Sequence, residues 1–172
     1  MKQPTTADEV LALHNLCQSD PQGYLQITNE WIRQNPRDAN AYFSRHFGWL
    51  KLNQPDRALD DLDKVVEIEP SQSAYLARGK VLREMGDLRG AISSYEKGEA
   101  LDPTEWKNDA IGPYFQADCH ARLGDEAAAI AYCRMLPSDF WTPGLFGAPA
   151  GDKTEIAAEL LSIAAGFQAN ET

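Results

Sequence analysis

Apolar residues recur at helical spacing along most of the chain, in segments that Gly, Asp and Pro separate. In residues 75–103, Ala91 and Tyr95 belong to one apolar stripe, and Gly86-Asp87 divides the stretch into two halves. Gly suits the left-handed residue that ends a helix, and Asp can cap the start of the next helix. The pattern therefore predicts two consecutive helices joined by a short turn.

This helix-turn-helix pattern occurs more than once. At a shift of 33 residues, Tyr42 aligns with Tyr75 and Ala58 with Ala91. Internal repetition favours a repeat architecture over an ordinary helical bundle. Within a single domain over residues 1–172, the spacing predicts a degenerate first repeat at 5–36, with helices near 6–18 and 22–34, and clear repeats at 39–70, 72–103 and 110–136.

The repeat over 72–103 resembles the tetratricopeptide repeat, whose signature combines spaced aromatic residues with Leu-Gly, Ala and Pro. The resemblance implies an all-α fold: a right-handed superhelix of antiparallel helix pairs (a TPR-like solenoid), with about nine helices and no sheet. Two residues depart from the signature. Arg78 stands where the family usually has Leu, and His46 stands where the preceding repeat should have Gly. The matching residues are Tyr75, Gly79, Leu82, Ala91, Tyr95 and Pro103.

Two further segments do not follow the repeat. The shift to the next Gly-Asp turn is 38 residues, which predicts an insertion in residues 104–111. Residues 137–152 contain three Pro and three Gly, but flexible linkers rarely carry Phe-Trp and Leu-Phe, so we expect an ordered loop. Asp152 and Glu155 then form a capping pattern. We expect them to begin a helix over 153–167 that caps the last repeat.

Charge and composition narrow the class of protein. The chain has 172 residues and a formal net charge of −10, which disfavours nucleic acid and anionic membranes as partners. The sequence shows neither a membrane-length apolar run nor a signal-peptide pattern, and it has three cysteines, so we expect a cytoplasmic protein. Possible i,i+4 pairs, Arg57–Asp61 and Asp60–Lys64, predict a solvated outer face on one acidic helix. The acidic residues of that helix are Asp56, Asp60, Asp61, Asp63, Glu67 and Glu69.

Candidate chemistry is sparse. The three cysteines, Cys17, Cys119 and Cys133, lack the spacing of a metal site, and we expect them to be buried apolar side chains. The sequence contains no nucleophile elbow, P-loop or dinucleotide-binding motif. We therefore expect a protein without metal, cofactor or enzymatic activity. An enzyme with a site between Asp139 and Asp152 is the weakest hypothesis.

Recognition of another protein is the remaining function, and the resemblance says where it would occur. In tetratricopeptide repeats the first helix of each pair lines a concave groove. For Phe43 and Phe47 the alternative is packing against the degenerate repeat. For the cations it is a surface salt bridge, such as Arg83 with Glu84 or Asp87. Carried over position by position, the groove residues are Asn40, Phe43, Phe47, Leu50, Leu76, Lys80, Arg83, Tyr114, Asp118 and Arg122.

Two functions from different classes remain open. The first is a protein-interaction module, an adaptor or a chaperone of the type III secretion kind, that binds a partner protein segment in the groove. One version of the fold clamps chaperone carboxylates with Lys and Asn; this chain has Phe43 and Phe47 there, so that version is disfavoured. The second is an immunity or inhibitor protein that blocks a basic toxin enzyme through its acidic surface.

Overall fold

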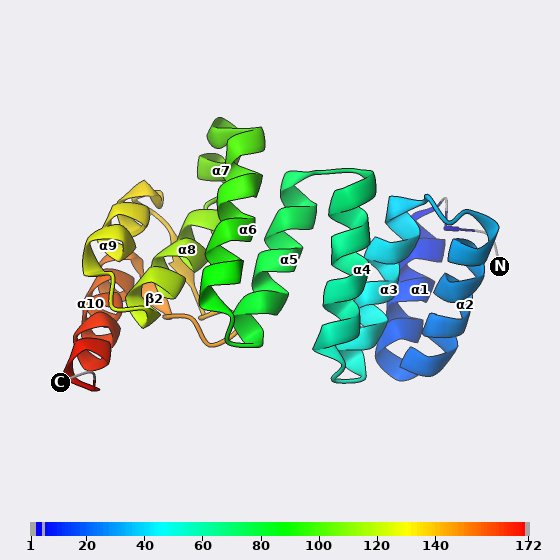
Figure 1. Ribbon diagram of the computed structural model, residues 1–172, viewed down its shortest axis with the longest axis horizontal. Coiled ribbons are helices and arrows are strands. Elements are labelled where there is room, and N and C mark those ends of the chain that lie inside the picture. The colour runs from blue at the N-terminus through cyan, green and yellow to red at the C-terminus, as the bar shows by residue number, and fades with distance from the viewer. Residues whose placement is uncertain (1–2, 5, 171–172) are drawn as a thin grey trace. The chain divides into compact units, whose positions relative to one another are not determined.

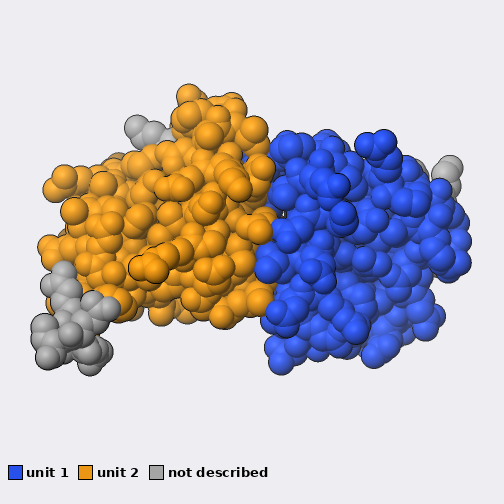
Figure 2. All heavy atoms as spheres, in the orientation of Figure 1, with its two compact units in different colours: residues 1–74 blue, residues 75–172 orange. Residues whose placement is uncertain are grey.

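The computed structural model describes residues 3–4 and 6–170, and helices dominate this part of the chain (Figure 1). It divides into two compact units, residues 1–74 and 75–172, which Figure 2 colours separately. The helices are α1 (Ala7–Ser19), α2 (Pro21–Gln34), α3 (Ala39–Lys51), α4 (Pro55–Ile68), α5 (Gln72–Glu84), α6 (Leu88–Leu101), α7 (Pro103–Asp109), α8 (Ile111–Arg122), α9 (Glu126–Met135) and α10 (Lys153–Asn170).

The first unit contains α1 to α4, in which α1 packs against α2, α2 against α3, and α3 against α4. At the start of α1, Thr6 and Glu9 form a capping box. Tyr24 on α2 occupies a position where the repeat would have a small residue, and its buried ring faces Gly48 on α3. The absence of a side chain at Gly48 lets α2 and α3 approach closely around this ring. His46, at the position where the repeat has Gly, is buried, and its ring lies against those of Phe43 and Phe47 on the same helix.

In the second unit, α5 and α6 form the clearest repeat. Gly79 lies against the ring of Tyr95, where an added Cβ would clash, and Ala91 is fully buried. Gly86 has a φ of +86°, the left-handed conformation expected at the end of a helix. The Asp87 side chain accepts a hydrogen bond from the Gly90 N–H, so it caps α6 as predicted.

The predicted insertion forms a short helix, α7. Its Trp106 is buried, and the indole N–H donates to Gln116 Oε1 on α8 at 2.8 Å. The ring lies against Gly98 on α6 and Gly112 on α8, so both neighbours contribute a small residue at the contact. The insertion therefore adds an aromatic residue to the core of the second unit.

The expectation of no sheet is wrong, because two strands of two residues each form an antiparallel pair. β1 (Trp141–Thr142) pairs with β2 (Gly151–Asp152) and closes the loop between them. Asp152 and Glu155 then cap α10 in both directions, with backbone-to-side-chain distances of 2.8 and 3.0 Å. α10 packs on α8 and α9 and buries Ile156 and Leu160, as a capping helix does.

The all-α class, built from antiparallel helix pairs, is confirmed. The described residues contain ten helices instead of about nine, because the insertion is helical. The predicted repeats at 39–70, 72–103 and 110–136 each hold one helix pair. The single domain over residues 1–172 stays a prediction.

Candidate functional site

A buried ion cluster joins α5 and α8 in the second unit. The carboxylate of Asp118 is fully buried and lies between two guanidinium groups. Arg83 Nε is 2.7 Å and Arg122 Nε 2.9 Å from the same carboxylate oxygen, Oδ2. A buried carboxylate is stable only when it is paired and hydrogen-bonded. Here two guanidinium groups pair with one carboxylate. The cluster therefore keeps a net positive charge. We call Arg83, Asp118 and Arg122 the ion triad.

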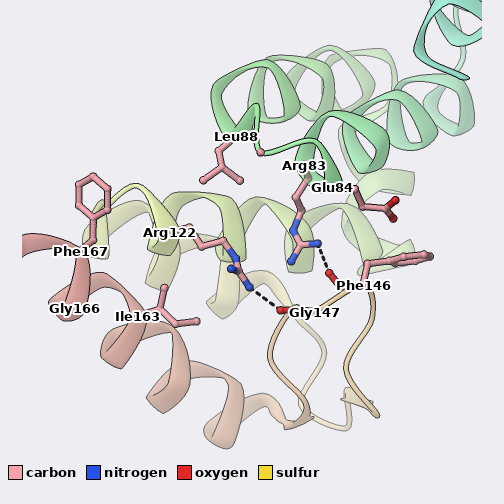
Figure 3. Close-up of a pocket in the computed structure, with 10 residues that line it drawn as sticks. Arg83, Glu84, Leu88, Arg122, Phe146, Gly147, Ile163, Gly166 and Phe167 are labelled. Atoms are coloured by element: carbon pink, nitrogen blue, oxygen red, sulfur yellow. Dashed lines mark hydrogen bonds between the residues drawn. The ribbon is translucent and has the colours of Figure 1, made fainter. Parts of the chain in front are cut away.

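A tight turn, Leu145–Ala148, binds the triad through its backbone. The Ala148 N–H donates to Leu145 O at 3.0 Å, and the central residues have positive φ, 52° at Phe146 and 73° at Gly147, as in type I′ turns. Arg83 Nη1 donates to Phe146 O at 2.7 Å, and Arg122 Nη2 donates to Gly147 O at 2.6 Å (Figure 3). Both carbonyl oxygens at the tip of the turn thus bind arginines of the triad.

Tyr114 and Lys80 add contacts to the same loop. The Tyr114 hydroxyl donates to Pro149 O at 2.6 Å and accepts from the Leu145 N–H at 3.3 Å, and burial raises the pKa of Tyr114. The Lys80 ammonium lies 4.3 Å from the centroid of the Phe146 ring, a cation–π distance. Burial lowers the pKa of Lys80. The first helices of the last two pairs therefore hold the chain's own loop.

A cavity of about 670 Å³ lies beside the turn. Figure 3 shows Arg122 reaching across it to Gly147, with Leu88 on one side and α10 on the other. Its apolar wall consists of Leu88, Ile163 and Phe167. The cavity therefore combines a cationic edge with apolar surface, a combination that suits a peptide side chain.

In the first unit, the predicted groove residues lie on α3. The Phe43 ring packs against the buried cluster of Ala39, Val65 and Ala74, so part of it belongs to the core, and none of these residues lies in the degenerate repeat. Phe47 contacts Phe43 edge to face at 5.7 Å between ring centroids, yet 47% of its surface is exposed. Phe47 is therefore a fixed and accessible aromatic side chain.

The repeats at 39–70 and 72–103 share a partly buried polar contact at the position where Arg replaces the Leu of the family signature. Arg45 Nε donates to Asp61 Oδ2 at 2.9 Å, and Arg78 Nη1 donates to Ser94 Oγ at 2.6 Å. In both pairs the partner lies 16 residues further along, on the second helix of the same repeat. The departure from the family signature is thus a cross-helix hydrogen bond.

The acidic helix α4 differs in part from its prediction. Asp61 is buried and bound to Arg45, so the expected pair of Arg57 with Asp61 is wrong. Burial raises the pKa of the Asp61 carboxyl, and the Arg45 contact opposes this shift. Lys64 pairs with Glu67 at 2.7 Å rather than with Asp60. The outer face is nevertheless acidic, because the exposed residues include Asp56, Asp60, Asp63 and Glu67.

The structure places the ten predicted site residues in both units. Asn40 and Phe47 are exposed and Leu50, Leu76 and Lys80 half-buried, whereas Arg83, Tyr114 and Asp118 are buried under the loop. The alternative of a surface salt bridge from Arg83 to Glu84 or Asp87 is wrong, because Arg83 is buried and pairs with Asp118. The sequence reasoning missed Phe146 and Gly147, although Leu-Phe-Gly-Ala-Pro within a Pro- and Gly-rich stretch is itself a turn signal.

The cysteines are free, buried thiols, as expected. Burial raises the pKa of all three thiols, and that of Cys119 to about 12, so none is activated for nucleophilic chemistry. Among the described residues, no group of three or more His, Cys, Asp or Glu side chains is arranged to hold a metal ion. None of the helices in the same residues has the length and apolarity needed to span a bilayer.

Sequence comparison finds a repeat family. Residues 76–141 match the model of the tetratricopeptide repeat. The chain is 34% identical over 76 residues to the Hsp70-Hsp90 organizing protein of Triticum aestivum, a match that covers 44% of this chain and 13% of that relative. It is 28% identical over 111 residues to bacteriophage adsorption protein A of Escherichia coli (strain K12), which covers 62% of this chain and 11% of the relative. The chain thus spans a small part of these proteins.

Comparison of structures supports the same fold. The crystal structure of MamA matches with a TM-score of 0.67 over 98% of both chains, at 15% sequence identity. A MamA RS-1 ArsTM double mutant matches with a TM-score of 0.63 at 16% identity, over 97% of this chain and 98% of that one. At these identities the likeness concerns the fold alone.

Proposed function

The chain belongs to the tetratricopeptide repeat family, and from this premise we propose that it is a protein-interaction module, an adaptor or chaperone that binds a segment of a partner protein. The proposed contacts lie on the first helices of the repeats: α3 in the first unit, and α5 and α8 in the second. The free, buried thiols are compatible with a reducing compartment, so we further propose a cytoplasmic location. We propose no catalysis.

The exposed ring of Phe47 is the observation that carries this proposal. Large aromatic side chains that are held in place and still accessible are typical of the residues that dominate binding energy. The rings of His46 and Phe43 hold Phe47, with centroid distances of 3.9 and 5.7 Å. A side chain that is already ordered loses little rotamer entropy when a partner covers it.

The second candidate is an inhibitor of a basic enzyme, and the exposed acids of α4 support it. Asp56, Asp60 and Asp63 would attract a basic partner and accelerate its association. Asp61 has no part in this surface, because it is buried against Arg45.

Quantitative capture of partners from an extract of the native cell tests the two proposals against each other. We expect Phe47→Ala to weaken capture by roughly 1–3 kcal/mol, which corresponds to about 5-fold to 150-fold. Leu101→Ala is the matched control, since Leu101 is an equally exposed apolar residue on α6, outside the first helices of the repeats. It should leave capture unchanged.

A third variant reverses three exposed charges on α4, Asp60→Lys, Asp63→Lys and Glu67→Lys. If a folded Phe47→Ala protein captures its partner normally and the charge reversal abolishes capture, the groove proposal is wrong and the inhibitor proposal gains. Circular dichroism of each variant shows first that the helices have formed.

A further inference from the structure

We propose that the face formed by α5 and α8 is a peptide-binding site for a partner's turn, and that the turn Leu145–Ala148 occupies it as an internal competitor. The inference rests on the proposed function and deepens it, because it names a site in the second unit and the chemistry of its ligand. The ligand is a protein segment with a type I′-like turn, whose two central carbonyl oxygens bind Arg83 and Arg122.

The contacts of the internal turn define what the site recognises. Arg83 and Arg122 bind the carbonyl oxygens of Phe146 and Gly147, and Tyr114 binds the backbone at Leu145 and Pro149. All of these contacts involve backbone groups of the turn, so any segment that adopts the same backbone can make them. The Phe146 ring, by contrast, is 56% exposed, so it contributes less to the contact with α5 and α8 than the backbone of the turn does.

The internal turn is a strained ligand. Phe146 has a φ of 52°, a left-handed conformation that a bulky side chain disfavours and that Gly or Asn adopts readily. Strain of this kind persists only where surrounding contacts enforce it. A partner with Asn-Gly or Gly-Gly at the centre of its turn would make the same contacts without that strain.

The internal turn also leaves part of the site unused. The cavity of about 670 Å³ beside Gly147 has an apolar wall of Leu88, Ile163 and Phe167. A partner segment that places an apolar side chain in this cavity gains contacts that the internal turn lacks. This gain matters because a tethered competitor acts at an effective concentration on the order of millimolar.

Charge favours a partner with an acidic flank. Lys80, Arg83 and Arg122 face Asp118 and Glu84 in this region, so cations outnumber carboxylates around the turn. The backbone carbonyls of the internal turn bring no charge that would balance this excess. An Asp or Glu next to the turn of the partner would balance it.

The test uses the full chain and an end-blocked, fluorescein-labelled peptide with the sequence of residues 142–151. Phe146→Pro prevents the internal turn, because Pro fixes φ near −65°. Phe146→Asn is the matched control, since Asn also removes the ring but tolerates positive φ. We expect Phe146→Pro to bind the peptide at least about tenfold more tightly than either the wild type or Phe146→Asn, by fluorescence anisotropy.

Arginine variants locate the site. In the Phe146→Pro chain, Arg122→Gln should weaken peptide binding by about tenfold or more, because it removes a charged donor to a carbonyl oxygen. Arg89→Gln, at an exposed position on α6, should leave binding unchanged. A Phe146→Pro protein that keeps its helices and binds the peptide no better than the wild type overturns the inference, and the turn is then only part of the fold.

A second measurement covers the case in which Phe146→Pro does not fold. In the ¹⁵N-labelled wild type, excess unlabelled peptide should accelerate exchange of the Leu145 and Ala148 amide protons, which bond to Tyr114 and to Leu145 in the closed turn. Unchanged exchange at saturating peptide overturns the inference. If the wild type forms dimers and the peptide dissociates them, the site binds the turn of a second copy of this chain. That result would overturn the assignment to a partner protein.

The outcomes also separate this inference from the proposed function. If Phe146→Pro ignores the peptide while Phe47→Ala still reduces capture of a partner, the inference fails and the proposed function stands. If Phe47→Ala leaves capture unchanged while the Phe146→Pro protein binds the peptide, the site on α5 and α8 is supported. The proposal that α3 binds a partner through Phe47 is then wrong.

Discussion

Removing one oxygen atom from the core should stabilise the second unit. The Tyr95 side chain is fully buried, and its hydroxyl has no hydrogen-bond partner among the described residues. Burial also raises the pKa of this hydroxyl. Tyr95→Phe keeps the ring, which packs against Gly79 and stacks on Phe115 at 6.3 Å between centroids, and removes only the unpaired group.

The size of the effect follows from the penalty of burying an unpaired polar group. Leaving a buried hydroxyl without a partner costs about 1–3 kcal/mol, so we expect Tyr95→Phe to raise the free energy of unfolding by about 1 kcal/mol. For a chain of this size that corresponds to an increase of roughly 2–4 °C in Tm. Tyr24→Phe is the matched control in the first unit. The Tyr24 hydroxyl donates to Ser44 O at 2.7 Å, so its loss should cost about 0.5–1.5 kcal/mol.

Urea denaturation followed by circular dichroism measures both variants against the wild type. The two substitutions make the same chemical change, so opposite signs would show that the hydrogen-bond partner decides the outcome. If Tyr95→Phe lowers the free energy of unfolding as Tyr24→Phe does, the Tyr95 hydroxyl has a partner in solution and the reasoning is wrong.

Three further substitutions or deletions test other parts of the fold by the same assay. Ala91→Leu should cost about 1–3 kcal/mol, because Ala91 is fully buried where α5 and α6 meet, and an unchanged Tm would remove it from that contact. Arg45→Ala should cost roughly 3 kcal/mol, since it leaves the buried Asp61 carboxylate without its cation; Asp61→Asn in the same chain should recover part of the loss. Deletion of residues 153–170 should expose apolar surface on α8 and α9 and cause aggregation, whereas a soluble truncation with an unchanged unfolding midpoint would make α10 an accessory element.

Local chemistry made the helices predictable from the sequence. Gly86 and Asp87 end one helix and begin the next because their conformational and hydrogen-bonding preferences act over a few residues. The same holds for the capping boxes of Thr6 and Asp152. Periodicity then added the repeat, and with it the pairing of α5 with α6 through Gly79.

Contacts between distant residues were not predictable in the same way. Arg83 has acidic neighbours in sequence, yet its partner is Asp118, 35 residues away, because α5 and α8 bring them together in the folded unit. The turn at Phe146 binds Arg83 across 63 residues. Helical periodicity relates residues only a few positions apart, so it says nothing about contacts over 35 or 63 residues. The sequence could therefore place cations in the groove but could not show that the chain's own loop binds them. The sequence did not predict the helical form of the insertion for a related reason. Trp106 of this helix packs against glycines on α6 and α8, and these contacts exist only in the folded unit.

The distribution of cations in the fold bears on which partners each surface suits. The net charge is −10, and several arginines are used inside the structure: Arg45 binds Asp61, and Arg83 shares Asp118 with Arg122. Exposed surface such as the outer face of α4 is therefore strongly acidic and would repel an acidic protein. The face around the ion triad is the opposite, because two arginines there serve one carboxylate. A partner that binds this face should carry its negative charge in a short segment beside the turn, so that the rest of its surface can remain neutral or basic. Raising the salt concentration should then slow its association without changing the backbone contacts that hold the bound turn.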